Sequence, residues 1–255
     1  NHAKDFGIEV GAPKADFSAV VKRSRGVAEG MSKGVQFLMK KNKIEVIMGN
    51  GKLKPGKKIS VTGADGKVTE YSASHILVAT GGRSRELPAL KQDGKKILGY
   101  RDAMVLPSQP MSMVIVGSGA IGSEFAYFYA AMGTKVTLVE FMQNIVPVED
   151  DDVSKALAKS FKGMGIDVLT ATEVTKVDTS GSGCKVTLKD TSGEKQIECD
   201  VVLSAAGVVA NIENIGLEAL GVKTDKGKVI VDANQQTSVA GLYAIGDCTP
   251  GQALA

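Results

Sequence analysis

Apolar residues recur at three- and four-residue steps near the start of the chain, which is the spacing of one face of an amphipathic helix. The positions are Phe17, Val20, Val21, Val27, Met31, Val35 and Leu38. Asp16 stands where an N-cap would, so we expect a long helix from there. Beyond it, Ile44–Met48 has strand character. Two further apolar segments flank the turn Gly63–Gly66 and predict a hairpin.

The period of the apolar pattern switches twice between residues 113 and 139. Met113–Val116 is typical of a buried strand, Ala120–Met132 of a helix, and Lys135–Val139 of a second strand. Together they have the length of about 30 residues that a βαβ unit requires. This segment therefore predicts two neighbouring parallel strands joined by a helix.

The alternation of helix and strand patterns continues beyond this unit. Asp151 or Asp152 would cap a helix that ends at Met164, and a buried strand follows at Val201–Ser204. Between them, three short alternating segments near 173–177, 185–189 and 196–199 predict an antiparallel insertion. We therefore expect an α/β fold of the doubly wound type with small antiparallel β insertions. The two prolines between residues 106 and 110 predict a linker, with a domain boundary near Gln109.

Composition narrows the class of protein further. Hydrophobic residues make up 43% and charged residues 23%, values typical of a globular chain, and the net charge of +3 is scattered rather than clustered. We therefore expect no nucleic-acid partner. The longest apolar run, Val201–Val209, is far shorter than the roughly 20 residues of a membrane span, so we expect no membrane insertion. Cys184, Cys199 and Cys248 show no disulfide or zinc spacing, which favours a reducing cytoplasm or organelle matrix. The acidic run 149–152 is interpreted as a helix N-terminal cluster, and no metal site is expected.

A glycine-rich turn follows the first strand of the βαβ unit and carries the strongest chemical signal. The sequence Gly117-Ser118-Gly119-Ala120-Ile121-Gly122 matches the GxGxxG pattern of dinucleotide-binding proteins. In that pattern, the first glycine permits the tight turn, the second lets backbone N–H groups approach a diphosphate, and the third allows close packing of helix and sheet. The helix N-terminus adds a positive dipole that favours an anion.

An acidic residue ends the second strand of the same unit. Glu140 lies close to the offset of about 20 residues at which such proteins place the acid that binds the adenosine ribose. A 2′-phosphate there would meet a like charge, and Phe141-Met142-Gln143-Asn144 supplies no cation. The pattern therefore favours NAD over NADP.

Two further segments occur together with this motif. A predicted strand delivers Thr80-Gly81-Gly82, and Thr237–Asp247 delivers an acid at the end of another strand. In this order, the three segments resemble the flavoproteins with two dinucleotide-binding domains, the class I pyridine nucleotide-disulfide oxidoreductases. The segments Gly165–Asp167, Glu213–Glu218 and Tyr243–Asp247 resemble the dihydrolipoamide dehydrogenase group of this family most closely, and the resemblance spans the whole chain.

The resemblance implies a fold of two Rossmann-like, FAD- and NAD(P)-binding domains in three layers. Residues 1–108 would belong to the FAD-binding domain, 109–228 would form the NAD-binding domain, and 229–255 would return to the FAD-binding or central domain.

The resemblance also implies site residues and two cofactors, FAD and NAD. NAD-contacting positions would be Gly117, Ser118, Gly119, Ala120, Ile121, Gly122, Ser123, Glu124, Glu140, Val174 and Gly207. FAD-contacting positions would be Gly51, Thr80, Gly81, Gly82, Asp247, Ala253, Leu254 and Ala255. Glu124 would also lie near the flavin, pair with a lysine that precedes the chain, and act as an auxiliary catalytic residue.

The implied reaction is oxidation of protein-bound dihydrolipoamide, with electrons passing through an enzyme disulfide and FAD to NAD⁺. The partner would be the dihydrolipoyl domain of a 2-oxo acid dehydrogenase complex or of the glycine cleavage system, and the enzyme would be a homodimer. The redox-active CxxxxC pair and the acid-base His-Glu pair of the family are expected before Asn1 and after Ala255. Val208 stands where many relatives have Arg. A related reductase for mercuric ion, glutathione or coenzyme A disulfide, or a nucleotide-binding module without redox activity, therefore remains an alternative.

Overall fold

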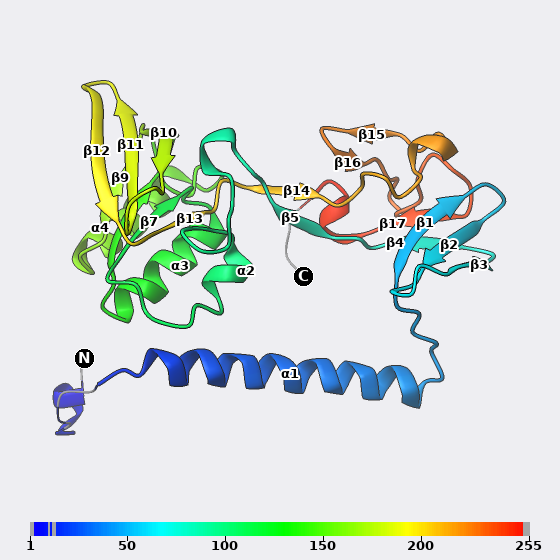
Figure 1. Cartoon of the computed structure of the whole chain (residues 1–255), viewed down its shortest axis with the longest axis horizontal. Helices are drawn as coiled ribbons and strands as arrows, with labels where there is room; N and C mark the ends of the chain where they lie inside the picture. Colours follow the sequence, from blue (N-terminus) through cyan, green and yellow to red (C-terminus); the bar gives the residue numbers. More distant parts are fainter. Residues whose placement is uncertain (1–2, 10, 12–13, 252–255) are drawn as a thin grey trace. The chain divides into compact units, whose positions relative to one another are not determined.

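The computed structural model of the chain describes residues 3–9, 11 and 14–251 (Figure 1). The chain forms two compact units. Unit 1 comprises the described residues up to Gly34 together with Glu86–Ala206. Unit 2 comprises Val35–Arg85 and the described residues from Gly207 onward.

Unit 1 is built on a five-stranded sheet in the order β6-β13-β7-β8-β9, with every neighbouring pair parallel. The strands are β6 (Ile97–Leu98), β7 (Ser112–Val116), β8 (Lys135–Val139), β9 (Asp167–Leu169) and β13 (Val201–Ser204). Helix α3 (Ala120–Ala131) connects β7 to β8, and α4 (Asp151–Gly163) precedes β9. The predicted βαβ unit is therefore confirmed, and it forms the centre of the sheet.

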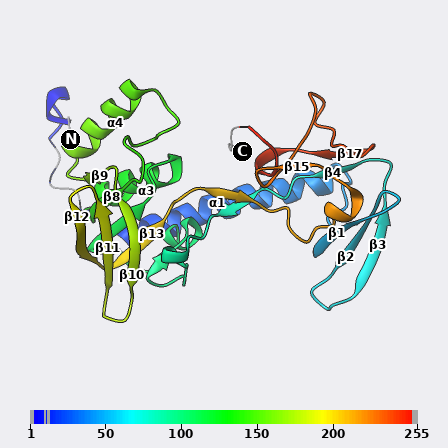
Figure 2. The same cartoon turned by 90° about the horizontal axis from the view of Figure 1, so that it is seen from above.

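The sheet of unit 1 is covered on both faces. Because side chains alternate along a strand, Met113 and Ile115 of β7 point into one cluster with α3 and α4, whereas Val114 and Val116 point into another. The second cluster packs against an antiparallel sheet of β10 (Glu173–Asp178), β11 (Cys184–Asp190) and β12 (Gly193–Cys199). Figure 2 shows α3 and α4 on one side of this unit and β10–β12 on the other. The expected three-layer α/β architecture with an antiparallel β insertion is confirmed.

Helix α1 (Phe17–Lys41) begins where the sequence predicts. The Asp16 carboxylate accepts a 3.0 Å hydrogen bond from the Ala19 N–H, as an N-cap residue does. Phe17 is buried in the core of unit 1, where its ring centroid lies 6.0 Å from that of Tyr129. Farther along, the helix leaves an apolar stripe exposed, formed by Val27, Met31, Val35 and Leu38.

Unit 2 contains short sheets around a smaller core. An antiparallel sheet is formed by β1 (Asn50–Lys54), β2 (Lys58–Thr62) and β3 (Val68–Ser72), which confirms the predicted hairpin. A parallel pair joins β4 (Ile76–Val78) to β17 (Leu242–Ala244), and an antiparallel pair joins β5 (Gly82–Ser84) to β14 (Val208–Ala210). A second antiparallel pair joins β15 (Thr224–Asp225) to β16 (Lys228–Val229). The described part also contains α2 (Tyr100–Ala103) and the 3-10 helices Ala3–Phe6, Pro88–Leu90, Glu218–Leu220 and Gly246–Cys248.

Two local expectations were wrong. Ile44–Met48 forms no strand, and Ile44, Val46, Ile47 and Met48 are exposed, so this segment has no buried face that would hold it in a sheet. The N-cap of α4 is Asp150, one residue before the expected aspartates.

The bounds of the two units also differ from the predicted domains. Strand β6 pairs in parallel with β13, so residues 86–108 belong to the unit that contains the GxGxxG turn. Residues 207–228 contribute β14 and Leu217 to the core of unit 2. Which cofactor each unit binds stays a prediction.

Candidate dinucleotide site

The turn between β7 and α3 requires glycine at two positions. Gly117 has φ +99°, and a Cβ there would collide with the carbonyl oxygen of Ala205 at the end of β13. A Cβ on Gly122 would collide with the carbonyl oxygen of Gly117. These two glycines therefore shape the turn and let α3 pack closely against the sheet, as the sequence predicts.

Gly119 differs from its two neighbours in the motif. Its φ is −62°, which any residue can adopt, and a Cβ at this position would have nothing within 4 Å. It is the N-cap residue of α3 and makes no side-chain cap, so the first N–H groups of the helix lack the usual side-chain acceptor. The fold itself does not require glycine here, whereas close approach of an anion to these N–H groups would.

Glu140 is held against this turn by three hydrogen bonds. Its Oε2 accepts from the Ser118 N–H at 2.8 Å and from the Ser118 hydroxyl at 2.6 Å, and its Oε1 accepts from the Met142 N–H at 2.8 Å. Glu140 is 6% exposed and Ser118 is fully buried. Two residues that the sequence predicts as NAD-contacting are thus brought into direct contact.

The remaining acceptor capacity of Glu140 determines what it can bind. A carboxylate has about four lone-pair sites, two on each oxygen. Ser118 occupies both sites on Oε2, and Met142 occupies one on Oε1. One acceptor position is left, which suits a ribose hydroxyl, so hydrogen bonds to both hydroxyls of a ribose would require Ser118 or Met142 to give way.

Ser118 links a third segment to the turn. Its hydroxyl accepts a 3.1 Å hydrogen bond from the Val146 N–H, and its carbonyl accepts one from the Ser123 hydroxyl at 2.9 Å. The Ser118 side chain therefore joins the glycine-rich turn, the end of β8 and the loop after it. This role was not predicted, because the GxGxxG pattern leaves the residue at that position open.

Ala120 and Ile121 begin α3 directly after the turn, and three further predicted NAD-contacting residues lie on other segments or farther along the helix. Glu124 is exposed on α3, and no hydrogen bond or ion pair to its carboxylate is found within the described residues. Val174 is half-buried in β10, where it packs against the second core cluster of unit 1. Gly207 has φ +99°, and a Cβ there would lie 3.9 Å from the Arg85 guanidinium. Their roles toward a cofactor stay predictions.

Four predicted FAD-contacting residues lie together where β5 begins and β14 ends. A Cβ on Gly82 would collide with Val208 and lie 3.4 Å from the Asp247 side chain, so glycine lets these segments meet. Asn211 donates its side chain to the Thr80 carbonyl at 3.0 Å and its N–H to the Gly81 carbonyl at 2.9 Å. Thr80, Gly81, Gly82 and Asp247 are thus brought together, as expected.

The four other predicted FAD-contacting residues are not placed in this cluster. Gly51 lies in β1 opposite Val61, with Ile59 as the nearest neighbour of its Cβ position. Ala253, Leu254 and Ala255 lie outside the described residues.

An ion pair that the sequence did not predict joins β5 to the segment after β14, beside the same cluster. The Arg83 guanidinium donates to both carboxylate oxygens of Glu213, at 3.1 and 2.9 Å. This hydrogen bonding lowers the pKa of Glu213 to about 2. Because 130 residues separate the partners, no local sequence signal identifies the pair.

Two negative findings bear on other classes of site. Within the described residues, no group of three or more His, Cys, Asp and Glu side chains is arranged to hold a metal ion. In the same part of the chain, no helix is long and apolar enough to span a membrane.

A parallel sheet with a glycine-rich strand-to-helix turn and a buried acid at the end of the next strand defines a dinucleotide-binding α/β protein. The family model described as pyridine nucleotide-disulphide oxidoreductase matches residues 6–255. The chain belongs to that family.

Several curated relatives are similar along the chain. A dihydrolipoyl dehydrogenase of Rhizobium etli is 47% identical, over 97% of this chain and 55% of its own length. A mitochondrial dihydrolipoyl dehydrogenase of Pisum sativum is 36% identical, over 98% of this chain and 51% of its own length. The chain thus spans about half the length of the curated relatives it matches.

Two solved structures are also similar. LpdA from Mycobacterium tuberculosis superposes with a TM-score of 0.90 at 31% identity, over 99% of this chain and 55% of that one. An HOCl-induced flavoprotein disulfide reductase from Escherichia coli superposes with a TM-score of 0.84 at 24% identity, over 94% of this chain and 54% of that one. The second likeness shows the fold alone.

Proposed function

We propose that this chain is the NAD-binding portion, with part of the FAD-binding portion, of a dihydrolipoyl dehydrogenase. The enzyme would oxidise the dithiol of a dihydrolipoyl group carried by a partner protein and reduce NAD⁺. The relatives named above support the substrate class. The observation that carries the proposal on this chain is the buried Glu140 carboxylate, fixed at the glycine-rich turn with one acceptor position left.

The residues of unit 1 fit an NAD molecule. The first N–H groups of α3 would bind the diphosphate, and Gly119 leaves the space that a side chain would fill. Glu140 would accept a hydrogen bond from the adenosine ribose, and the segment Phe141–Asn144 contains no cation for a 2′-phosphate. These features favour NAD over NADP and thereby disfavour NADP-dependent disulfide reductases.

The residues of unit 2 fit part of a flavin site. Gly82, Thr80 and Gly81 form a backbone bend without large side chains, and Asp247 lies beside it. Asp247 would accept a hydrogen bond from a hydroxyl of FAD near its ribityl–pyrophosphate junction. When bound, FAD and NAD supply two-electron transfer between a dithiol and a nicotinamide.

This chain contributes orientation rather than the reacting thiols. Cys184, Cys199 and Cys248 are all buried, and their spacing does not match the CxxxxC pair of the family. By fixing the diphosphate and the adenosine ribose of NAD, the residues described above would help convert an encounter in solution into a positioned reaction, an effect worth up to roughly 7–11 kcal/mol in favourable cases.

The proposal extends to assembly and location. The partner would be the dihydrolipoyl domain of a 2-oxo acid dehydrogenase complex or of the glycine cleavage system, and the enzyme would act as a homodimer. It would function in the bacterial cytoplasm or in an organelle matrix, and it would serve cell redox homeostasis. The relatives named above include both bacterial and mitochondrial proteins.

The test uses the full-length protein. We expect it to be yellow, to lose flavin absorption on addition of dihydrolipoamide, and to produce NADH. Glu140→Ala should raise the KM for NAD⁺ more than it lowers kcat, because the ribose contact is remote from the reacting carbon and equal in ground and transition states.

Ser182→Ala is the matched control, because Ser182 is exposed and lies outside the glycine-rich turn. An unchanged KM in Glu140→Ala would remove the role assigned to this acid. A yellow protein that reduces glutathione or mercuric ion instead of reacting with dihydrolipoamide would replace the proposed substrate. A colourless protein that binds NADH would indicate a nucleotide-binding module without redox activity.

A further inference from the structure

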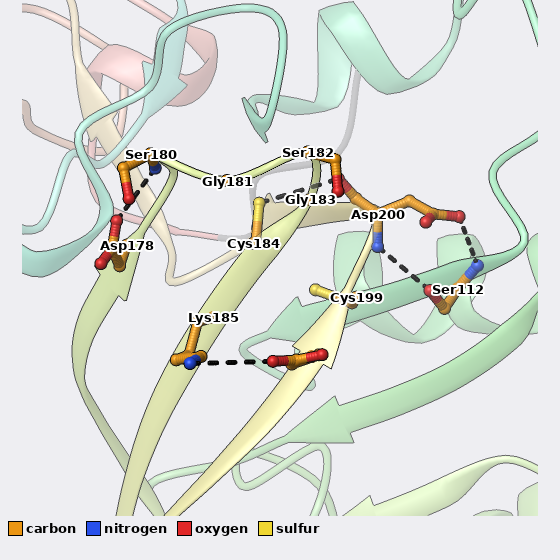
Figure 3. A pocket seen from close by; sticks show the side chains of 11 residues that line it. Ser112, Asp178, Ser180, Gly181, Ser182, Gly183, Cys184, Lys185, Cys199 and Asp200 are labelled. Carbon is orange, nitrogen blue, oxygen red and sulfur yellow. Dashed lines mark hydrogen bonds and ion pairs between the residues drawn. The ribbon is translucent and has the colours of Figure 1, made fainter.

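Two cysteines face each other at the base of the antiparallel insertion of unit 1. Cys184 begins β11, Cys199 ends β12, and the strand register pairs them directly. Figure 3 shows them on neighbouring strands. Sequence spacing gave no reason to pair them.

The distance between the two backbones suits a disulfide. Residues directly opposite each other in an antiparallel ladder have Cα atoms about 4.5–5.5 Å apart. Disulfides are formed across Cα separations of roughly 4.4–6.8 Å. Paired residues of a ladder also project from the same face of the sheet, and both cysteines belong to the same buried cluster. The backbone separation and the common face therefore allow a disulfide between the two sulfurs.

The electrostatic surroundings of the two thiols differ. Burial raises the pKa of Cys199 to about 12 and also raises that of Cys184. The nearby Lys96 ammonium lowers the pKa of Cys184, whereas the Asp93 and Asp200 carboxylates raise it. Cys184 is therefore the thiol that reaches the reactive thiolate form more readily.

A cavity gives a small molecule access to the pair. It has a volume of about 400 Å³ and is lined by both cysteines together with Ser112, Gly183 and Asp200. A Cβ on Gly183 would collide with the Cys199 carbonyl oxygen at 2.5 Å, so glycine lets the backbone before β11 lie against the end of β12 beside the pair. Cys248, in contrast, is fully buried in unit 2 and does not line this cavity.

We propose that Cys184 and Cys199 are a modification site, a dithiol that a small two-electron oxidant such as hydrogen peroxide converts to a cross-strand disulfide. The Cys184 thiolate attacks one peroxide oxygen, the O–O bond breaks, and a sulfenic acid forms with release of hydroxide, which takes up a proton to give water. The Cys199 thiol then displaces the second oxygen as water, and the S–S bond forms. Two thiols are oxidised and one peroxide is reduced to two waters.

The test uses the whole 255-residue chain, and its outcome does not depend on the proposed enzyme activity. Cys248→Ser protein is treated with hydrogen peroxide, unfolded under alkylating conditions, and analysed by mass spectrometry. We expect loss of two hydrogen atoms, no alkylated cysteine, and a peptide linked through Cys184 and Cys199. Dithiothreitol should restore two alkylatable thiols, and the rate should rise with pH because the thiolate is the attacking species.

The single variants Cys184→Ser and Cys199→Ser should form no intramolecular disulfide, and circular dichroism verifies that they fold. If either variant does not fold, the Cys248→Ser protein alone decides the outcome. Two thiols that remain alkylatable in oxidised Cys248→Ser protein would overturn the proposal. A disulfide in the unsubstituted chain that contains Cys248 would overturn it as well.

Discussion

The Ser118 hydroxyl donates a 2.6 Å hydrogen bond to Glu140 Oε2, although 22 residues separate the two in sequence. Because the Ser118 N–H binds the same oxygen at 2.8 Å, the orientation of the carboxylate is set by the glycine-rich turn itself. The acid that would bind the ribose and the turn that would bind the diphosphate are therefore one preorganised unit.

Removal of this hydroxyl should weaken both nucleotide binding and the fold. In Ser118→Ala, Glu140 keeps two backbone N–H donors but loses the hydroxyl, and the Val146 N–H keeps only the Ser118 carbonyl at 3.2 Å as its acceptor. We expect the free energy of unfolding to fall by about 1–3 kcal/mol and the Kd for NADH to rise roughly two- to tenfold. Urea denaturation and calorimetric titration measure the two quantities. Ser182→Ala, at an exposed position, should change neither, and an unchanged Kd in Ser118→Ala would show that Ser118 does not position Glu140.

Substitution of Gly117 should destabilise the fold, whereas substitution of Gly119 should weaken NADH binding with little effect on stability. Gly117→Ala forces alanine to φ +99° and into the Ala205 carbonyl, so we expect it to cost about 2 kcal/mol or more in stability. Gly119→Ala meets no protein atom within 4 Å, and its stability should stay within about 0.5 kcal/mol of the original. It should nevertheless weaken NADH binding, because the added methyl group occupies the space next to the N–H groups of α3. Thermal unfolding and NADH fluorescence titration test both, and tight NADH binding by Gly119→Ala would place the diphosphate elsewhere.

The Arg83–Glu213 ion pair should make the free energy of unfolding depend on pH in the acidic range. The folded-state pKa of Glu213 is about 2, below the ordinary value of 4.5, so the ion pair stabilises the fold above about pH 4.5. This contribution is lost as the pH falls from 4.5 toward 2. Both side chains are about half exposed, so we expect less than about 1 kcal/mol after screening by solvent.

The measurement is the difference in unfolding temperature between the original chain and Glu213→Gln. It should be largest near pH 6 and should shrink by about pH 3. Glu218→Gln, at an exposed position on a neighbouring segment, is the control. A difference that stays constant over this pH range would contradict the assigned role of the ion pair.

Sequence patterns were sufficient where one segment determines its own conformation. The period switch from Met113 to Val139, the glycines of the turn and Glu140 all lie within one βαβ unit, and the structure places them as predicted. Ile44–Met48 shows the limit of such patterns, because its apolar residues match a strand but the fold provides no face to bury them.

The contacts that sequence reasoning missed are long-range. Arg83 and Glu213 meet because β5 pairs with β14. Cys184 and Cys199 meet because the turn after β11 sets the register with β12. Neither pairing can be inferred from local periodicity, since each depends on which strand becomes the neighbour.

The exposed stripe of α1 has a practical consequence for anyone who handles this chain. Val27, Met31, Val35 and Leu38 are each at least half exposed, so water contacts a continuous line of hydrocarbon along the helix. Such a line favours association between molecules as the concentration rises. Preparations of the chain should therefore scatter more light at high protein concentration, and a mild non-ionic detergent should reverse that increase.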